Sequence, residues 1–320
     1  MPVPVWLRDV AYVNDPVIPV ATRLGQEMLQ YCDYTARVME TLHVAIDDAV
    51  WGMTECVQAI WPEASVTCFG SYASGLWLPS SDVDVVVMGI PQLATSHKAT
   101  HTNRKHKRFV LGVYELELIA DALRQQPWVQ AIEVVANAHT RRGMDASALV
   151  REYITAVPIL YPLILVVKQF LREKGLNSAF TGGLSSYCVA LMAVYLVEKQ
   201  HATAYVGADV GQLLLDFVEF YGTMFNYGTT GISLKPDAFG EYYLGASFLV
   251  DTAMPQLVID DPVYEDGAHN AAAGAFAIAR VVAAFENAFY AVSFHHASRF
   301  TPSPLSQLLH WSGFGGVYAS

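Results

Sequence analysis

The chain has 320 residues, enough to bury a full hydrophobic core in one large domain or in two smaller ones. Hydrophobic residues make up 53% of it and charged residues only 15%, but the longest apolar runs are too short or too interrupted to cross a bilayer, which argues against a membrane protein. The formal net charge of −11 has the wrong sign for a protein that grips nucleic acid through a broad basic surface.

The cysteines and the N-terminus predict an intracellular protein. Four cysteines are widely spaced, with no Cys-x-x-Cys pair and no metal-ligand grouping. The first residues lack a basic run followed by an apolar core, so no secretory signal is expected. We therefore expect a protein of a reduced compartment, the cytoplasm or the mitochondrion, that is not secreted.

The first predicted elements lead to a pair of acids. Apolar residues recur at helical spacing over residues 20–60, which predicts one or two helices. Residues 68–87 then read as a strand, a glycine-bearing turn, a short helical turn and a second strand. Asp82 and Asp84 open the second strand, and because alternate residues of a strand point the same way, both carboxylates can lie on one side of it. Two hard oxygen ligands there predict a platform for Mg²⁺ or Mn²⁺.

The turn before the acids predicts a phosphate contact. Gly70 and Ser71 stand directly after the first strand, and Ser71 precedes Asp82 by eleven positions. A glycine lets backbone N–H groups approach a phosphate, and a serine adds a hydroxyl donor. A bare Asp-x-Asp also occurs at solvated strand ends, so the spacing from the Gly-Ser turn is what favours the catalytic interpretation.

Further along, the pattern changes from mixed to helical. Residues 97–108 are basic and polar, which fits either an RNA contact or a solvated loop. Residues 109–125 predict a helix and residues 128–136 a strand, so the first part is expected to form a small mixed sheet with helices. From residue 147 onward the predicted elements are helices, at 147–156, 162–174, 184–198 and 210–225. A domain boundary near Gly143 is expected from this change.

A second cluster of motifs lies in the helical part. Lys168 and Arg172 are four residues apart and share a helix face, from which a cationic pair can clamp phosphates. After two glycines, Ser185, Ser186 and Tyr187 open the next predicted helix. A helix N-terminus with hydroxyls suits a phosphate, and a tyrosine can stack on a base. The structural alternative is a pair of snorkelling cations, an ordinary serine N-cap and a core tyrosine.

Together these segments resemble the DNA polymerase β superfamily of nucleotidyltransferases, in the branch of terminal uridylyltransferases and poly(A) polymerases that act on RNA, and in particular the minimal uridylyltransferases of trypanosomatids involved in RNA editing. The resemblance implies an α+β fold: a polymerase-β-like palm over residues 38–143 and a mostly α-helical, poly(A)-polymerase-associated domain over residues 144–320, on which residues 1–37 pack. It covers nearly the whole chain after residue 20 and implies a minimal catalytic core.

The implied reaction is template-independent addition of UMP from UTP to RNA 3′ ends by a two-metal-ion mechanism. Asp82 and Asp84 would hold Mg²⁺ or Mn²⁺, while Gly70 and Ser71 position the triphosphate. The family's triphosphate lysines fall on Lys168 and, with arginine in place of lysine, Arg172. The remaining contacts of this region fall on Ser185, on Ser186 for the triphosphate, and on Tyr187 for base stacking. Because the chain is acidic, its RNA is expected to be held locally or delivered by a protein complex.

The choice of nucleotide is predicted from a third stretch. Residues 257–272 resemble the family's Asp-Pro segment followed by His-Asn at a helix start, which implies base-edge contacts by Asp261 and His269. A histidine in this place is associated with uracil over adenine. The alternative is a turn signal and a helix cap. UTP is therefore the expected substrate, and a poly(A) polymerase that uses ATP stays open.

One expected part of the site has no clear match. The family's third carboxylate would fall on Glu133, or less well on Asp145, and its base-contacting asparagine falls on Ala146, with Ser147 beside it to retain part of that contact. Without the third acid, the chain would be a weakened enzyme or a UTP-binding subunit of an RNA-processing complex. Four aromatic residues fit either a partner surface for such a subunit or the core: Phe217, Phe220, Tyr221 and Phe225.

Overall fold

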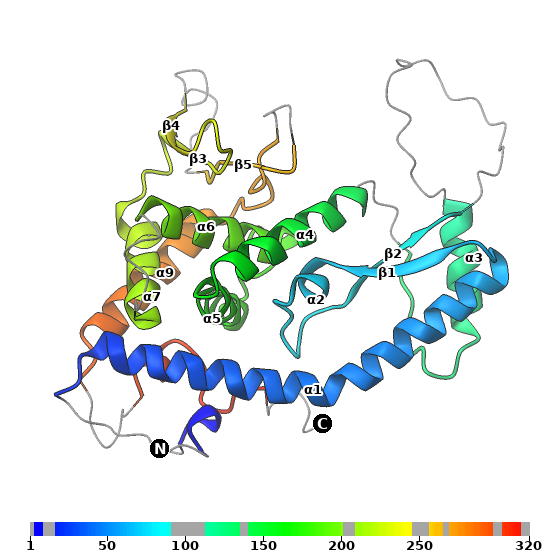
Figure 1. Ribbon diagram of the computed structural model, residues 1–320, viewed down its shortest axis with the longest axis horizontal. Helices are drawn as coiled ribbons and strands as arrows, with labels where there is room; N and C mark the ends of the chain where they lie inside the picture. Colours follow the sequence, from blue (N-terminus) through cyan, green and yellow to red (C-terminus); the bar gives the residue numbers. More distant parts are fainter. Residues whose placement is uncertain are drawn as a thin grey trace.

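A single long helix spans the molecule and contacts both of its parts. The computed structural model describes residues 3–8, 17–90, 113–134, 140–200, 209–244, 256–264, 269–296 and 303–314. The predicted helical region 20–60 is one helix, α1 (Val20–Ile60), which runs along one edge of the view in Figure 1. It packs on α7 (Val210–Glu219) at one end and on β1 (Ser65–Phe69) and α3 (Val113–Arg124) at the other.

The predicted strand, turn and strand form a hairpin. β1 pairs antiparallel with β2 (Asp84–Met88), and Phe69 lies opposite Asp84. The chain enters α2 (Gly70–Ser74) directly from β1, as the glycine and serine predicted. A small apolar cluster beneath the hairpin joins it to α1 and α3 through Val57 and Ile119. The cluster reaches Val66 and Val87, which pair near the end of the hairpin opposite Asp84, so the hairpin is anchored at that end.

The strand predicted over residues 128–136 was wrong in its described part. Residues 128–134 are coil, and residues 135 and 136 lie outside the described ranges. The backbone N–H groups of Gln126 and Val129 donate to Leu123 and Gln126 carbonyls in turns that end α3, at 3.0 and 3.2 Å. Within the predicted strand, the Val129 N–H therefore serves a local turn after Pro127 rather than a neighbouring strand. The basic segment 97–108 also lies outside the described residues.

The helical part is built around two buried helices. α5 (Leu160–Glu173) and α6 (Ser186–Lys199) are almost wholly buried, as expected for helices that are apolar on most sides. The other long helices here are α4 (Thr140–Ala156), α7 and α9 (Ile278–Ser293). The shorter helical segments are η1 (Val5–Leu7), η2 (Ala179–Thr181), η5 (Leu305–Gln307) and the π-helical η4 (Phe220–Met224).

The aromatic residues of α7 and η4 belong to this core. Phe217 and Tyr221 are fully buried, and Phe220 and Phe225 are nearly so. Their rings pack against one another, with the Phe217 and Tyr221 centroids 4.9 Å apart. The partner-surface interpretation of these four residues was therefore wrong, and the core alternative was right.

Helical periodicity gave no sign of a small mixed sheet in the helical part. It comprises β3 (Thr230–Ser233), β4 (Gly240–Tyr243) and β5 (Ile259–Asp260), in the order β4-β3-β5. β3 pairs antiparallel with β4 and parallel with β5. The predicted α+β class, with a mostly helical second part, is confirmed, and this sheet places Asp261 at the end of β5.

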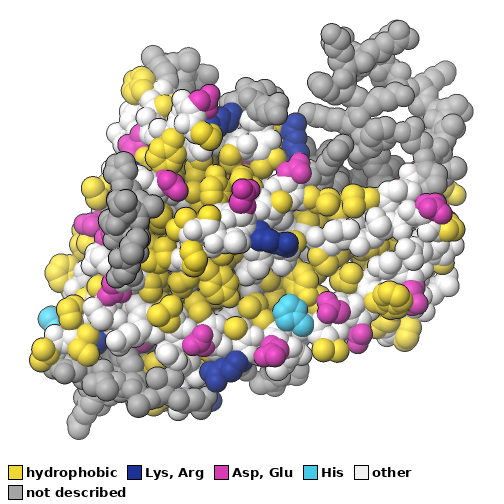
Figure 2. Space-filling view, viewed as in Figure 1, with side chains coloured by type: hydrophobic (Ala, Val, Ile, Leu, Met, Phe, Trp, Pro, Cys, Tyr) yellow, Lys and Arg dark blue, Asp and Glu magenta, His cyan; other side chains and the backbone are white. Residues whose placement is uncertain are grey.

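The face shown in Figure 2 carries many apolar and acidic side chains, in line with a chain that is 53% hydrophobic and has a net charge of −11. In this view, which is that of Figure 1, apolar side chains gather over the middle of the molecule and acidic side chains are scattered along its lower edge. No helix in the described ranges is long and apolar enough to cross a membrane. α4 runs without a break through the boundary expected near Gly143, so the division of the chain into two domains stays a proposal.

Candidate active site

A cavity of about 310 Å³ lies where the hairpin, α2, α4 and the start of α6 meet. It brings together residues from three separate predicted motifs: Gly70, Ser71, Asp84, Ser147, Ser185, Ser186 and Tyr187. This volume is within the range of small-ligand sites. The predicted phosphate turn, one of the two acids and the predicted helix start therefore share one cavity.

Gly70 fits this place because only glycine leaves room for the acid. Its φ of +66° is in the left-handed region, which residues with a side chain adopt at a cost. A Cβ atom at this position would lie 2.2 Å from Oδ2 of Asp84. The turn that enters α2 thus sets the Asp84 carboxylate directly against the first residue of the short helix.

Gly70→Ala is expected to remove activity with a modest loss of stability. The new methyl group displaces the Asp84 carboxylate, and the left-handed φ costs about 1 to 2 kcal/mol. Gly75→Ala is the matched control, since Gly75 has a φ of +82° and a Cβ atom added there would have no other atom within 4 Å. Thermal unfolding should show a loss of stability in both variants, because both glycines have positive φ, whereas nucleotide addition should be lost only in Gly70→Ala. Equal activity in the two variants would contradict the placement of Asp84.

Helix α4 holds α2 at both of its ends. The Ser147 hydroxyl accepts a hydrogen bond from the Gly70 N–H at 2.7 Å and donates to the Gly143 carbonyl at 2.6 Å. One turn later, the Arg151 guanidinium donates to the Ala73 carbonyl. The Ser147 hydroxyl thus donates to the protein backbone, and its predicted contact with a base stays a prediction. Sequence reasoning missed Arg151, since a surface arginine on a helix carries no sign of its partner.

The two acids stand on a braced loop. The Trp77 indole N–H lies 3.0 Å from the Ser81 carbonyl and 3.1 Å from that of Asp82, which fixes the loop before β2. Partial burial raises the pKa of Asp84, the nearby Asp82 charge raises it further, and Lys168 opposes both. Two hard carboxylates whose charges repel each other fit a divalent cation. Asp82 and Asp84 are therefore the residues that would hold Mg²⁺.

A third acid does not join them in the part of the chain that the structure describes. That part holds no group of three or more His, Cys, Asp or Glu residues placed to bind a metal. Glu133 is exposed on the coil that follows α3, and Asp145 is exposed on α4. Neither lines the cavity, so the role expected of Glu133 stays a prediction.

Lys168 and Arg172, the predicted cationic pair, lie in different surroundings. Lys168 is 5% exposed, and its ammonium donates to the Leu76 carbonyl at the far end of the α2 loop. Burial lowers the pKa of Lys168 to about 7, while Asp84 acts in the opposite direction. Arg172 is half-buried one turn further along α5, and neither Arg172 nor Lys168 lines the cavity. Four residues advance a helix by about 6 Å, enough to separate the two groups.

The start of α6 supplies the opposite wall of the cavity. Ser185 is the N-cap and its side chain accepts the Cys188 N–H at 3.2 Å, so the helix begins at Ser186, one residue later than expected. A Cβ atom at Gly183 would lie 2.2 Å from the Leu176 carbonyl oxygen, so the chain can turn here only with glycine. Ser186 and Tyr187 both line the cavity. The N-cap alternative holds for Ser185 alone.

Asp261 and His269, the residues of the third predicted motif, are linked to Tyr187 by hydrogen bonds. The Tyr187 hydroxyl donates to Oδ1 of Asp261 at 2.8 Å, and the other carboxylate oxygen is 3.1 Å from Nδ1 of His269. Asp261 is 5% exposed and also accepts the Val263 N–H. Burial raises the pKa of Tyr187, and the Asp261 charge adds to the rise. Residues predicted separately as base-stacking and base-edge groups are thus joined by hydrogen bonds.

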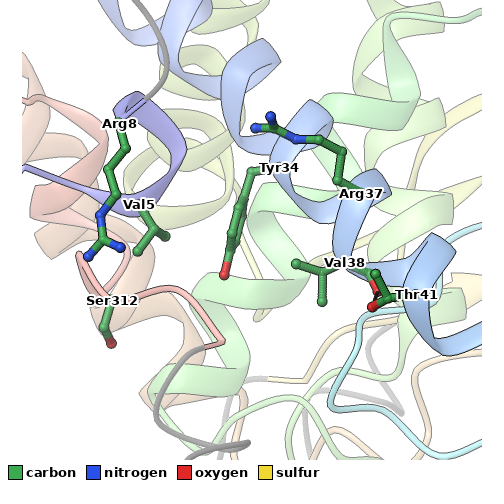
Figure 3. Close-up of a pocket in the computed structure, with 7 residues that line it drawn as sticks. All are labelled: Val5, Arg8, Tyr34, Arg37, Val38, Thr41 and Ser312. Carbon is green, nitrogen blue, oxygen red and sulfur yellow. Dashed lines mark hydrogen bonds between the residues drawn. The ribbon is translucent and has the colours of Figure 1, made fainter.

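A second, larger cavity holds none of the predicted residues. It has a volume of about 620 Å³ and lies between the N-terminal segment and α1. In Figure 3, Tyr34 projects between Arg8 and Ser312 on one side and the α1 residues Val38 and Thr41 on the other. Neither acid of the hairpin reaches it, so the functional argument rests on the smaller cavity.

Two family descriptions match the chain. The nucleotidyltransferase domain matches residues 53–118, which include the hairpin and both acids. The Cid1 family poly A polymerase description matches residues 209–266, which include the small sheet and Asp261. The first match includes the cavity residues of the hairpin and α2, and the second includes Asp261, which accepts a hydrogen bond from the cavity residue Tyr187.

Among relatives, Poly(A) RNA polymerase protein 1 of Eremothecium gossypii is 30% identical over 272 residues, which are 76% of this chain and 40% of that protein. The chain spans less than half the length of the first curated relatives it matches. The polymerase core of TRAMP, an RNA surveillance complex, has a similar fold, with a TM-score of 0.76 and 23% identity over 95% of this chain and 98% of that one.

Two structures of the Cid1 poly(U) polymerase also have this fold. One is bound to MgGTP, and the other is a histidine-to-asparagine variant bound to MgATP. Each has a TM-score of 0.57 and 19% identity, and covers 86% of this chain and 98% of that one. From the two matched segments and the relatives, the chain belongs to the polymerase-β-like nucleotidyltransferases, in the family of Cid1-type poly(A) and poly(U) polymerases.

Proposed function

We propose that this protein transfers nucleoside monophosphates from an NTP to RNA 3′ ends without a template. The observation that carries the proposal is the cavity that places Gly70, Ser71 and Asp84 opposite Ser186 and Tyr187. A triphosphate between these walls would meet a hydroxyl-bearing turn on one side and a helix N-terminus on the other. Lys168 does not line the cavity, but its buried ammonium donates to the carbonyl of Leu76, which does.

Each residue has a distinct task in this proposal. Asp82 and Asp84 hold Mg²⁺, which when bound neutralises charge on the triphosphate and the leaving pyrophosphate. Ser71 and Ser186 orient the phosphates by hydrogen bonds. Lys168 supplies a positive charge at a site from which water is largely excluded, where a fixed charge is most effective. Tyr187, whose hydroxyl is held by Asp261, presents its ring to the base.

We propose UTP as the preferred nucleotide. His269 is held against Asp261 beside the base-stacking Tyr187, as a base-edge reader would be. In the Cid1 poly(U) polymerase, a histidine-to-asparagine variant was obtained bound to MgATP, in work on UTP selectivity. ATP is the second candidate, because the curated relatives are named poly(A) RNA polymerases. The trypanosomatid likeness and a role in RNA editing are not supported beyond the sequence motifs.

We further propose that a protein partner supplies RNA binding. The chain carries a net charge of −11, which repels the RNA backbone. The relative with a TM-score of 0.76 is the polymerase core of an RNA surveillance complex, which is a precedent for such an arrangement. The cytoplasm or the mitochondrion is the proposed location.

Primer extension with each of the four NTPs is expected to show addition from UTP well above the others. The assay uses a short RNA, Mg²⁺ or Mn²⁺, and the full chain. His269→Asn should raise ATP use relative to UTP, since it replaces the ring at the base edge. If the wild-type protein prefers ATP, then ATP replaces UTP as the proposed substrate. Stabilisation by UTP without extension by any NTP would make the protein a binding subunit.

A further inference from the structure

Three planar groups from two distant segments form a stack beside the candidate active site. The guanidinium carbon of Arg142 lies 3.5 Å from the centroid of the Tyr264 ring. The Tyr264 ring also stacks on the His269 ring: the two rings are nearly parallel, at an angle of 7°, and their centroids are 3.9 Å apart. Cations and flat rings attract each other in this arrangement. No motif in the sequence pointed to Arg142 or Tyr264.

The stack and Asp261 fix the His269 ring from two directions. Tyr264 covers a face of the imidazole, while Asp261 contacts its edge at Nδ1, 3.1 Å away. A ring held by both a face and an edge keeps one orientation, although 43% of the side chain is exposed. Nε2 is the ring nitrogen left without a partner among the described residues, and it is the atom available to a ligand.

Arg142 also connects this ring to the phosphate side of the cavity. It lies on α4, next to Gly143, whose carbonyl accepts the Ser147 hydroxyl, and Ser147 holds the Gly70 N–H. The same helix therefore fixes the turn beside the metal-binding acid and, through Tyr264, the base-reading histidine. A shift of α4 would move both ends of a bound nucleotide's site together.

We propose that Arg142 and Tyr264 are positioning residues that set nucleotide selectivity by holding the His269 ring. The proposal rests on the proposed function, since it assigns these residues to base reading at that site. Neither side chain needs to touch the nucleotide. Their contribution is to keep Nε2 of His269 in one place, so that a base with the matching edge is favoured and one with the wrong edge is rejected.

The test measures selectivity in matched variants. Tyr264→Ala and Arg142→Ala are expected to shift the ratio of kcat/KM for UTP to that for ATP about tenfold, mainly through KM, with kcat for UTP kept. Tyr264→Phe retains the ring and should keep the wild-type ratio. Arg280→Ala removes an exposed arginine from α9 and controls for the change of charge. An unchanged ratio in Tyr264→Ala, or an equal shift in Tyr264→Phe, would overturn the proposal.

A second measurement separates this proposal from the proposed function. The stacked tyrosine shields the His269 ring protons, so their NMR resonance, assigned with His269→Asn, should move in Tyr264→Ala and stay in Tyr264→Phe. This readout needs no catalysis. A protein that adds no nucleotide but shows this shift would refute the proposed function and retain the ring's positioning. A resonance that does not move in Tyr264→Ala would refute the positioning itself.

Discussion

Replacing both Asp82 and Asp84 with alanine is expected to abolish nucleotide addition while the protein stays folded. In the proposed function the two carboxylates hold the metal ion, so their loss would remove it and lower the rate by orders of magnitude. Burial and the neighbouring acid raise the pKa of Asp84, which means that its charged form is disfavoured in the folded state. Removing that charge should leave the unfolding temperature equal or slightly higher.

The control for this experiment removes the same amount of charge elsewhere. Asp48 and Glu55 are exposed on α1, and alanine at both positions should leave activity close to the wild-type level. Primer extension and thermal unfolding are measured side by side on the two double variants. Activity like that of the wild type in the Asp82 and Asp84 variant would end the catalytic assignment of the hairpin.

The second large effect is expected from Lys168→Met. Methionine fills a similar volume without charge, so NTP binding should weaken severely as the buried positive charge is lost. Lys174→Met, which removes an exposed lysine at the end of the same helix, should retain activity. KM for the nucleotide and kcat are both measured, and normal kinetics in Lys168→Met would show that this lysine serves only to hold the Leu76 carbonyl.

The same variant gives a prediction for the pH dependence of stability. Burial lowers the pKa of Lys168 from 10.5 to about 7, so between these two values the unfolded chain binds more protons than the folded one. Stability of the wild type should therefore gain a contribution that rises with pH from about 7 to 10.5. In Lys168→Met this rise should disappear, which denaturant unfolding at several pH values, without metal, would detect. An identical slope in both proteins would argue that Lys168 stays charged when buried.

Local patterns in the sequence predicted the elements that bear the site. The spacing of Gly70, Ser71 and the two acids was enough to predict a strand, turn, helical turn and strand, because backbone geometry over about twenty residues is set mainly by local chemistry. The buried helices α5 and α6 were likewise predicted from their apolar periodicity. The resemblance to a known family added that residues of these segments contact the same nucleotide.

Contacts between distant segments could not be predicted in this way. Arg151 bonds to a carbonyl 78 residues away, and Arg142 stacks on a ring that is still more distant in sequence. A helix surface pattern shows that such side chains are polar but not what they meet. The strand predicted over residues 128–136 is absent from its described part for a related reason: a strand needs a neighbouring strand, and the Val129 N–H donates within a local turn instead. The short strands of the small sheet carried too few residues to show alternation.

The continuous course of α1 limits how far the hairpin and the helical part can move relative to each other. A helix of 41 residues is about 60 Å long, and its hydrogen bonds resist a sharp bend. One end of α1 packs on α7 and the other on β1, so the helix rigidly connects the hairpin that carries Asp82 and Asp84 with the helical part that carries Lys168. If the proposed function holds, the two walls of the nucleotide site should therefore keep a nearly constant separation, and a proline placed near the middle of α1 would make that separation variable.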